Sequence, residues 1–181
     1  MTHAESDRSL PEPNPVEARF SQAYDELRRL AGALTRDDAA TLNPTALVHE
    51  AWLKLAASPD LAPRSGLHFK RLAARAMRQV LVEAARRRNA EKRGGGKWIS
   101  VTLSAAEGSA VETAADMLAL DAALETLARM EPRQARMVEL RFFGGLDVAE
   151  TALALEVSEA TVLRDWRAAK AWLSREIQRA L

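Results

Sequence analysis

Apolar residues recur at the spacing of an α-helix in several separate stretches of this 181-residue chain, the first of them beginning at Pro15. Such a chain folds by packing helices through their apolar faces. Ala, Leu, Arg and Glu dominate the composition, and aromatic residues make up only 5% of it, which favours helix over sheet. The sequence therefore predicts an all-α protein, with two small helical bundles joined by a flexible linker.

The first bundle is predicted over residues 15–93, after a polar leader over residues 1–14 whose composition is typical of disorder. In its second helix, Asn43 is placed as the N-cap and Pro44 at the first helical position, where the missing N–H costs nothing. The third helix is predicted from about His68 to Arg88. All three helices have apolar faces, and matched faces of this kind make a small bundle.

The second helix of this bundle has two distinct faces. Its apolar face, which is predicted to be core, consists of Leu47, Val48, Ala51, Trp52 and Leu55. The other face carries His49, Glu50 and Lys54, which are available to a partner. The spacing of Trp52 alone favours the core, and a lone exposed histidine such as His49 is as often incidental as functional.

Positive charge is concentrated in the middle of the chain. The whole chain carries a net charge of +1, but residues 64–97 hold eleven Lys/Arg against two Asp/Glu, a net charge of +9. Residues 1–63 and 98–181 each carry −4. Such a concentration is typical of a site for nucleic acid or another polyanion, whereas a solvated helix usually mixes charges of both signs.

Residues 94–116 break the helical pattern and are predicted to be a linker. Their three consecutive glycines do not form a phosphate-binding loop, because Lys97 is followed by Trp98 rather than by Ser or Thr. From Trp98 to Asp116 the only charges are acidic.

The second bundle is predicted over residues 117–181. Pro132 is placed to open a helix that Gly144 and Gly145 end, and Asp147 with Glu150 has the spacing of a capping box for a short helix. Its predicted apolar positions are Leu118, Leu120, Leu124, Leu127, Ala135, Val138, Leu140, Phe142, Phe143, Val148, Ala152 and Leu155.

Ser158 is placed to cap the last helix, whose two faces differ. The face predicted to be buried carries Val162, Trp166, Ala169 and Leu173, spaced four, three and four residues apart. The outer face carries Leu163, Arg164, Arg167 and Lys170, with Glu159 and Ala160 at its leading end. A short helix, a tight turn and a second helix with a basic outer face form a helix-turn-helix, whose second helix enters a DNA major groove. A plain helical hairpin with a solvated face is the alternative.

Three stretches carry a resemblance to a known family: NPTALVHEAWLKL, FKRLAARAMRQVLVEAARRRNAEKRGGG and ELRFFGGLDVAETALALEVSEATVLRDWRAAKAWL. Their sequence and order resemble the extracytoplasmic-function (ECF) subfamily of sigma-70-type bacterial sigma factors, which keep only regions 2 and 4. The resemblance covers Pro15 to Ile177 and implies that residues 15–93 are region 2 and residues 117–181 region 4. It departs at Glu156, where the family often has glycine in the turn, so we expect backbone strain there.

The resemblance implies two DNA contacts. Region 4 of the family reads the minus-35 element, which implies this role for Ser158, Glu159, Ala160, Leu163, Arg164, Arg167 and Lys170. Region 2 opens and holds the minus-10 element, which implies this role for Arg64, Ser65, Arg71, Arg75, Arg78 and Arg86. Arginine suits both roles, because its guanidinium binds phosphates and donates hydrogen bonds to the O6 and N7 atoms of guanine.

The resemblance also implies partners. In the family, region 2 docks on the clamp helices of the largest polymerase subunit, which implies this role for Leu47, His49, Glu50, Trp52 and Lys54. Region 4 meets the flap of the second-largest subunit, and the linker threads toward the RNA exit path, although a solvated spacer explains the acidic linker equally well. Core RNA polymerase and promoter DNA are the expected partners, and whether an anti-sigma factor also binds stays open. The expected function is promoter recognition and transcription initiation, without catalysis.

Other classes of function have less support. The chain has no cysteine, three scattered histidines and no apolar run near eighteen residues, so we expect no disulfide, metal, cofactor or membrane partner, and a cytoplasmic location. No paired carboxylates or nucleophile set point to an enzyme. The main alternative is a stand-alone helix-turn-helix regulator that acts without polymerase, although such proteins usually dimerise and no heptad seam is visible. A protein that binds RNA or acidic membranes is supported only by residues 64–97.

Overall fold

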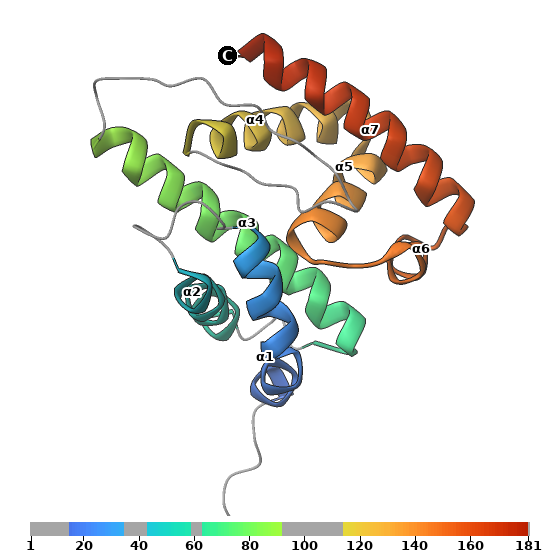
Figure 1. Ribbon diagram of the computed structural model, residues 1–181. Coiled ribbons are helices and arrows are strands. Elements are labelled where there is room, and N and C mark those ends of the chain that lie inside the picture. Colours follow the sequence, from blue (N-terminus) through green and yellow to red (C-terminus); the bar gives the residue numbers. More distant parts are fainter. Residues whose placement is uncertain (1–14, 35–42, 59–62, 92–113, 181) are drawn as a thin grey trace, which may run out of the picture.

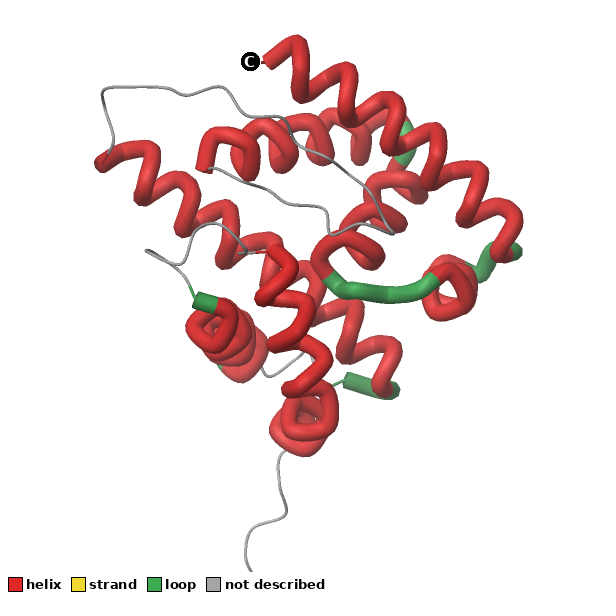
Figure 2. Tube along the Cα trace, viewed as in Figure 1, coloured by secondary structure: helices red, strands yellow, loops and turns green. Residues whose placement is uncertain are grey.

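The computed structural model describes residues 15–34, 43–58, 63–91 and 114–180. Within these ranges every regular element is a helix (Figure 2), which confirms the all-α prediction. The predicted leader and nearly all of the predicted linker lie outside the described residues. No helix in the described ranges combines the length and the apolar character needed to cross a membrane.

Three helices, α1 (Pro15–Leu34), α2 (Pro44–Ala56) and α3 (Gly66–Glu91), form what we call the N-terminal unit. The start of α2 is as predicted, since the Oδ1 of Asn43 accepts a hydrogen bond from the N–H of Ala46 at 2.8 Å. The start of α3 lies two residues before the predicted position. There the Oγ of Ser65 accepts a hydrogen bond from the N–H of His68 at 3.0 Å, so Ser65 is the N-cap.

The C-terminal unit consists of α4 (Ala114–Met130), α5 (Pro132–Val138), the π-helical turn η2 (Glu139–Phe143), α6 (Val148–Leu155) and α7 (Glu159–Ala180). Pro132 opens α5 as predicted. The helix predicted from Pro132 to the glycines is not regular, because its second half widens into η2. Such π-helical turns are rare and occur mostly as single turns within helices.

The caps predicted around α6 and α7 are all present. The N–H of Glu150 donates to Asp147 Oδ1 at 2.7 Å while the N–H of Asp147 donates to Glu150 Oε2 at 3.2 Å, which completes the capping box. The N–H of Thr161 donates to Ser158 Oγ at 3.2 Å at the start of α7. Glu156 ends α6 with φ 56° and ψ 44°, the left-handed conformation expected at a position where glycine would be unstrained.

Within the N-terminal unit, α3 is the helix that contacts the C-terminal unit, with α1 and α2 on one side of it and α4 on the other (Figure 1). The apolar face predicted for α3 is largely buried, including Phe69, Met77 and Val80. A second face of α3, carrying Ala74, Val82 and Ala85, is buried as well. One continuous hydrophobic core therefore includes residues of both units, a contact that the sequence did not predict.

Candidate nucleic-acid interface

The outer face of α7 is the most exposed of the predicted sites. Ser158, Glu159, Ala160, Leu163, Arg164 and Arg167 are exposed, and Lys170 is half-buried. Leu163 is 45% exposed, so its apolar side chain is accessible among the polar residues of this face. The Nε of Arg167 donates to the carbonyl oxygen of Leu163 at 3.2 Å, so its guanidinium is held along the helix surface. These residues form one continuous face because they lie three or four positions apart.

The opposite face of α7 anchors it to the rest of the C-terminal unit. The four residues predicted to be buried, Val162, Trp166, Ala169 and Leu173, are all buried. The guanidinium of Arg141, from η2, lies 4.6 Å from the centre of the Trp166 ring, in a cation–π contact. Burial lowers the pKa of Arg141, opposed by the charge of Asp147. The widened turn η2 therefore helps to fix the orientation of α7, a role that the sequence did not predict for Arg141.

A buried carboxylate ties α5 to α7. Asp165 is 6% exposed, and its Oδ2 accepts hydrogen bonds from Arg133 Nε at 3.0 Å and from Arg133 Nη2 at 2.8 Å. Its other oxygen lies 3.5 Å from the Nε of Arg164. The two hydrogen bonds from Arg133 therefore tie α5 to α7, whereas Arg164, with a side chain that is 69% exposed, adds only an ion pair.

The residues predicted to contact the minus-10 element lie just before α3 and along it. Arg64 and Ser65 precede the helix, and Arg71 and Arg75 are exposed on its first half. The Oγ of Ser65 is engaged in capping. Arg78 and Arg86, further along, differ from these because each forms an ion pair with a carboxylate of the C-terminal unit.

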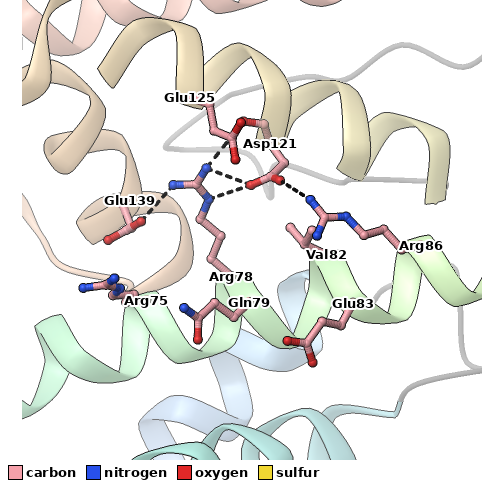
Figure 3. A pocket seen from close by; sticks show the side chains of 9 residues that line it. All are labelled: Arg75, Arg78, Gln79, Val82, Glu83, Arg86, Asp121, Glu125 and Glu139. Atoms are coloured by element: carbon pink, nitrogen blue, oxygen red, sulfur yellow. Dashed lines mark hydrogen bonds and ion pairs between the residues drawn. The ribbon is translucent and has the colours of Figure 1, made fainter. Parts of the chain in front are cut away.

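Arg78 is held by two carboxylates of the C-terminal unit (Figure 3). Its Nε and Nη2 donate to Asp121 Oδ1 at 3.0 and 2.7 Å, and its Nη1 donates to Glu139 Oε2 at 3.0 Å. Burial lowers the pKa of Arg78, but the bonds to Glu139 and Asp121 outweigh this and raise it. The Nη2 of Arg86 lies 3.6 Å from Asp121 Oδ2. These side chains border a cavity of about 470 Å³ between α3, α4 and η2, whose lining also includes Arg75, Gln79, Val82, Glu83 and Glu125.

Lys70 links α3 to α1 in its own unit and to α6 in the C-terminal unit. Its Nζ donates to Glu26 Oε1 on α1 and to Glu150 Oε1 on α6, each at 2.7 Å. Burial alone lowers the pKa of Lys70, but the bonds to Glu150 and Glu26 outweigh it and raise that pKa. The raised pKa of Lys70 therefore contributes its full stabilisation of the fold below the unfolded-state pKa of lysine, about 10.4. This contribution is lost only as the pH rises through the folded-state pKa of Lys70. The Lys70 links persist at neutral pH.

The residues predicted to contact polymerase all lie on α2, but they differ in how far their side chains are buried. His49 and Glu50 are exposed, and Lys54 is half-buried, with its Nζ donating to Glu83 Oε1 on α3 at 2.9 Å. Leu47 is completely buried. Trp52 is half-buried, and its ring lies 4.7 Å from that of Phe20 on α1. Leu47 and Trp52 thus support the outer face of α2 from within.

The acidic partners of α3 were not among the residues predicted from the sequence. Asp121 lies four residues after Met117 and three before Leu124, both of them buried, so an acidic residue occupies an apolar position of α4. Arg78 lies four residues from both Ala74 and Val82, in the same way. Charged residues at buried positions usually have a charged partner, which is the signal that could have revealed this pair. Among the described residues no group of His, Cys, Asp and Glu could hold a metal ion.

Helix α6, the turn at Glu156 and α7 have the arrangement of a helix-turn-helix, and α3 presents further exposed arginines, so the fold offers two candidate surfaces for DNA. The family model described as ECF sigma factor matches residues 12–179. The chain therefore belongs to the ECF sigma factor family, as its resemblance implied, and such family membership implies a promoter-specificity factor that binds RNA polymerase and DNA. Comparison with curated proteins and with solved structures gives no significant match.

Proposed function

We propose that this chain binds core RNA polymerase through α2, reads a minus-35 element with α7 and holds a minus-10 element with the N-terminal half of α3. The observation that carries the proposal is the outer face of α7. Arg164 and Arg167 are exposed there on a helix whose N-cap, turn and buried face are all formed. A helix presented in this way fits the major groove of DNA, where arginine recognises guanine.

The first half of α3 supports the second contact. Arg64, Arg71 and Arg75 are exposed from the N-terminus of α3 onward, and arginines in such a row suit the phosphates of a strand that leaves the duplex. Phe69, the aromatic residue nearest to them in sequence, is 1% exposed. Base stacking at this site therefore needs a residue other than Phe69, and phosphate contacts carry most of the binding.

On α2, the exposed side chains of His49 and Glu50 and the half-buried Lys54 provide the polar surface for polymerase. Leu53, on the same helix, is 46% exposed and adds an apolar contact of the kind found at the centre of protein interfaces. We propose that Leu47 and Trp52 act by supporting this surface. The clamp helices of the largest polymerase subunit are the partner that the family implies.

The first test is binding to bacterial core RNA polymerase in competition with the primary sigma factor, measured by size-exclusion chromatography. We expect the purified chain to co-elute with core polymerase and to displace the primary sigma factor. The double substitution His49→Ala/Glu50→Ala should weaken co-elution, while Arg164→Ala should leave it unchanged. Binding to DNA alone, without any binding to polymerase, would instead identify a stand-alone regulator.

A further inference from the structure

Leu163 is a large apolar residue on a face of α7 whose other residues are polar or small. Its side chain is 45% exposed, and within the described part of α7 it is the only large apolar side chain exposed to this degree. An exposed leucine has no functional meaning by itself, because apolar atoms make up more than half of an ordinary protein surface. What distinguishes Leu163 is its position on the helix.

Leu163 lies within the first two turns of α7, the part of a recognition helix whose side chains reach the base edges. Ala160 precedes it by three positions and Arg167 follows it by four, and both are exposed, so the three side chains are neighbours on one face. The start of the helix is fixed by Ser158, whose Oγ accepts a hydrogen bond from the N–H of Thr161 at 3.2 Å. In a major groove, Leu163 would therefore face base pairs rather than solvent.

The base edges in the major groove offer one kind of apolar group, the C5 methyl of thymine. The other groups that distinguish the base pairs there are hydrogen-bond donors and acceptors. A leucine side chain pressed against such a polar group removes its water and gives no hydrogen bond in return, which costs free energy. Against a thymine methyl the same side chain buries apolar surface, which is favourable. A leucine at this position thus discriminates by attracting one base and by rejecting the others.

Arg167 limits where that thymine can lie. Its Nε donates to the carbonyl oxygen of Leu163 at 3.2 Å, which leaves its two terminal nitrogens for the O6 and N7 atoms of guanine. Side chains four residues apart on a helix have Cβ atoms about 5–6 Å apart, and successive base pairs are stacked about 3.4 Å apart. The two side chains therefore reach base pairs that are about one to two steps apart.

We propose that Leu163 is a specificity-determining residue: it selects a thymine of the minus-35 element through the C5 methyl, within about two base pairs of the guanine that Arg167 binds. This inference rests on the proposed function, because it takes α7 as the helix that reads this element. It adds the identity of one base and the chemical group by which that base is recognised.

Replacement of thymine by uracil tests the proposal, because uracil pairs as thymine does and lacks only the C5 methyl. The full chain, alone and assembled with bacterial core RNA polymerase, first selects duplexes from a pool with a random upstream segment. Each thymine of the preferred sequence is then replaced by uracil, one at a time, and affinity is measured for the unsubstituted chain and for Leu163→Ala. Leu153→Ala is the matched control, since it removes a leucine that is 72% exposed on α6.

We expect one thymine at which uracil weakens binding by the unsubstituted chain and by Leu153→Ala about fourfold, the equivalent of burying one methyl group. The same replacement should leave binding by Leu163→Ala unchanged, because that variant has no side chain that reaches the methyl. No effect of uracil at any thymine would overturn the inference, even where Leu163→Ala binds more weakly, since Leu163 would then contact the sugar–phosphate backbone. A uracil effect of the same size in Leu163→Ala would overturn it as well.

Replacement of guanines by 7-deazaguanine, which lacks the N7 acceptor, locates the base that Arg167 binds. At that base the replacement should weaken binding by the unsubstituted chain but not by Arg167→Ala. We expect this guanine within about two base pairs of the methyl-dependent thymine. A larger separation would overturn the proposed arrangement of the two side chains.

Failure of the proposed function gives a different result. If the chain selects no preferred sequence, α7 does not read DNA, and that part of the proposed function falls together with the inference. If Arg164→Ala and Arg167→Ala weaken binding to the selected sequence but no thymine methyl matters, only the inference falls.

Discussion

At the scale of single residues, the proposed recognition of DNA depends most on Arg164 and Arg167, the two exposed arginines on the outer face of α7. Arg164 lies beside the buried carboxylate of Asp165 at 3.5 Å, and Arg167 is bonded to the backbone of Leu163. Side chains held in this way lose less rotamer freedom when they bind. If α7 reads bases as proposed, these two arginines are the residues through which it would hydrogen-bond to them.

We predict that Arg164→Ala and Arg167→Ala each lower transcription from a cognate promoter by about tenfold or more, because one arginine–guanine pair provides about 1–3 kcal/mol of discrimination. Co-elution with core polymerase should be retained. Arg136→Ala, an exposed arginine on α5, is the control with the same loss of charge. A parallel loss of polymerase binding in both α7 variants would contradict the assignment.

Trp166 is the residue on which the packing of α7 most depends. It is 8% exposed and lies under Arg141, so Trp166→Ala should cost about 3–5 kcal/mol, as for other buried aromatics. Thermal unfolding followed by circular dichroism measures this loss. Trp172→Ala, on the same helix at a half-buried position, should cost less. An unchanged melting transition in Trp166→Ala would show that Trp166 does not contribute to the stability of the core.

At the scale of elements, the caps were predictable because they depend on residues close together in the sequence. Asn43, Ser158 and the Asp147–Glu150 pair each bond to backbone groups within three residues, and local rules of this kind need no tertiary information. The turn η2 was not predictable in this way. It widens a helix whose residues Glu139 and Arg141 contact α3 and α7, respectively.

The turn between α6 and α7 stores strain that can be relieved. Glu156 has φ 56°, and the left-handed conformation costs an L-residue roughly 1–2 kcal/mol, part of which glycine recovers at a cost in unfolded-state entropy. We predict that Glu156→Gly raises the free energy of unfolding by about 0.5–1 kcal/mol, measured by urea denaturation. Glu156→Ala removes the same charge but keeps the Cβ, and should give no such gain. Equal gains in both would mean that charge, not backbone strain, limits stability there.

At the scale of the whole molecule, α3 joins two helical units into a single core. Because apolar residues of both units belong to that core, we expect the free chain to unfold in one calorimetric transition. Ala74→Leu, at a position with no exposed surface that faces Gly144, should overpack this contact at a cost of about 1–3 kcal/mol and split the transition into two. Ala90→Leu, at an exposed position of α3, should leave it single. Two transitions in the unsubstituted chain would contradict a shared core.

The sequence by itself determined the helices, most of their caps, the buried face of α7 and its basic outer face. Each of these follows from residues three or four positions apart, whose relation is set by helix geometry alone. Only the tertiary structure decided which charges on α3 are free. Arg71 and Arg78 share the same residue type and nearly the same side of the helix, but Arg71 is exposed while Arg78 binds Asp121 and Glu139. Those partners come from 43 and 61 residues away along the chain, and no local periodicity relates residues at that separation.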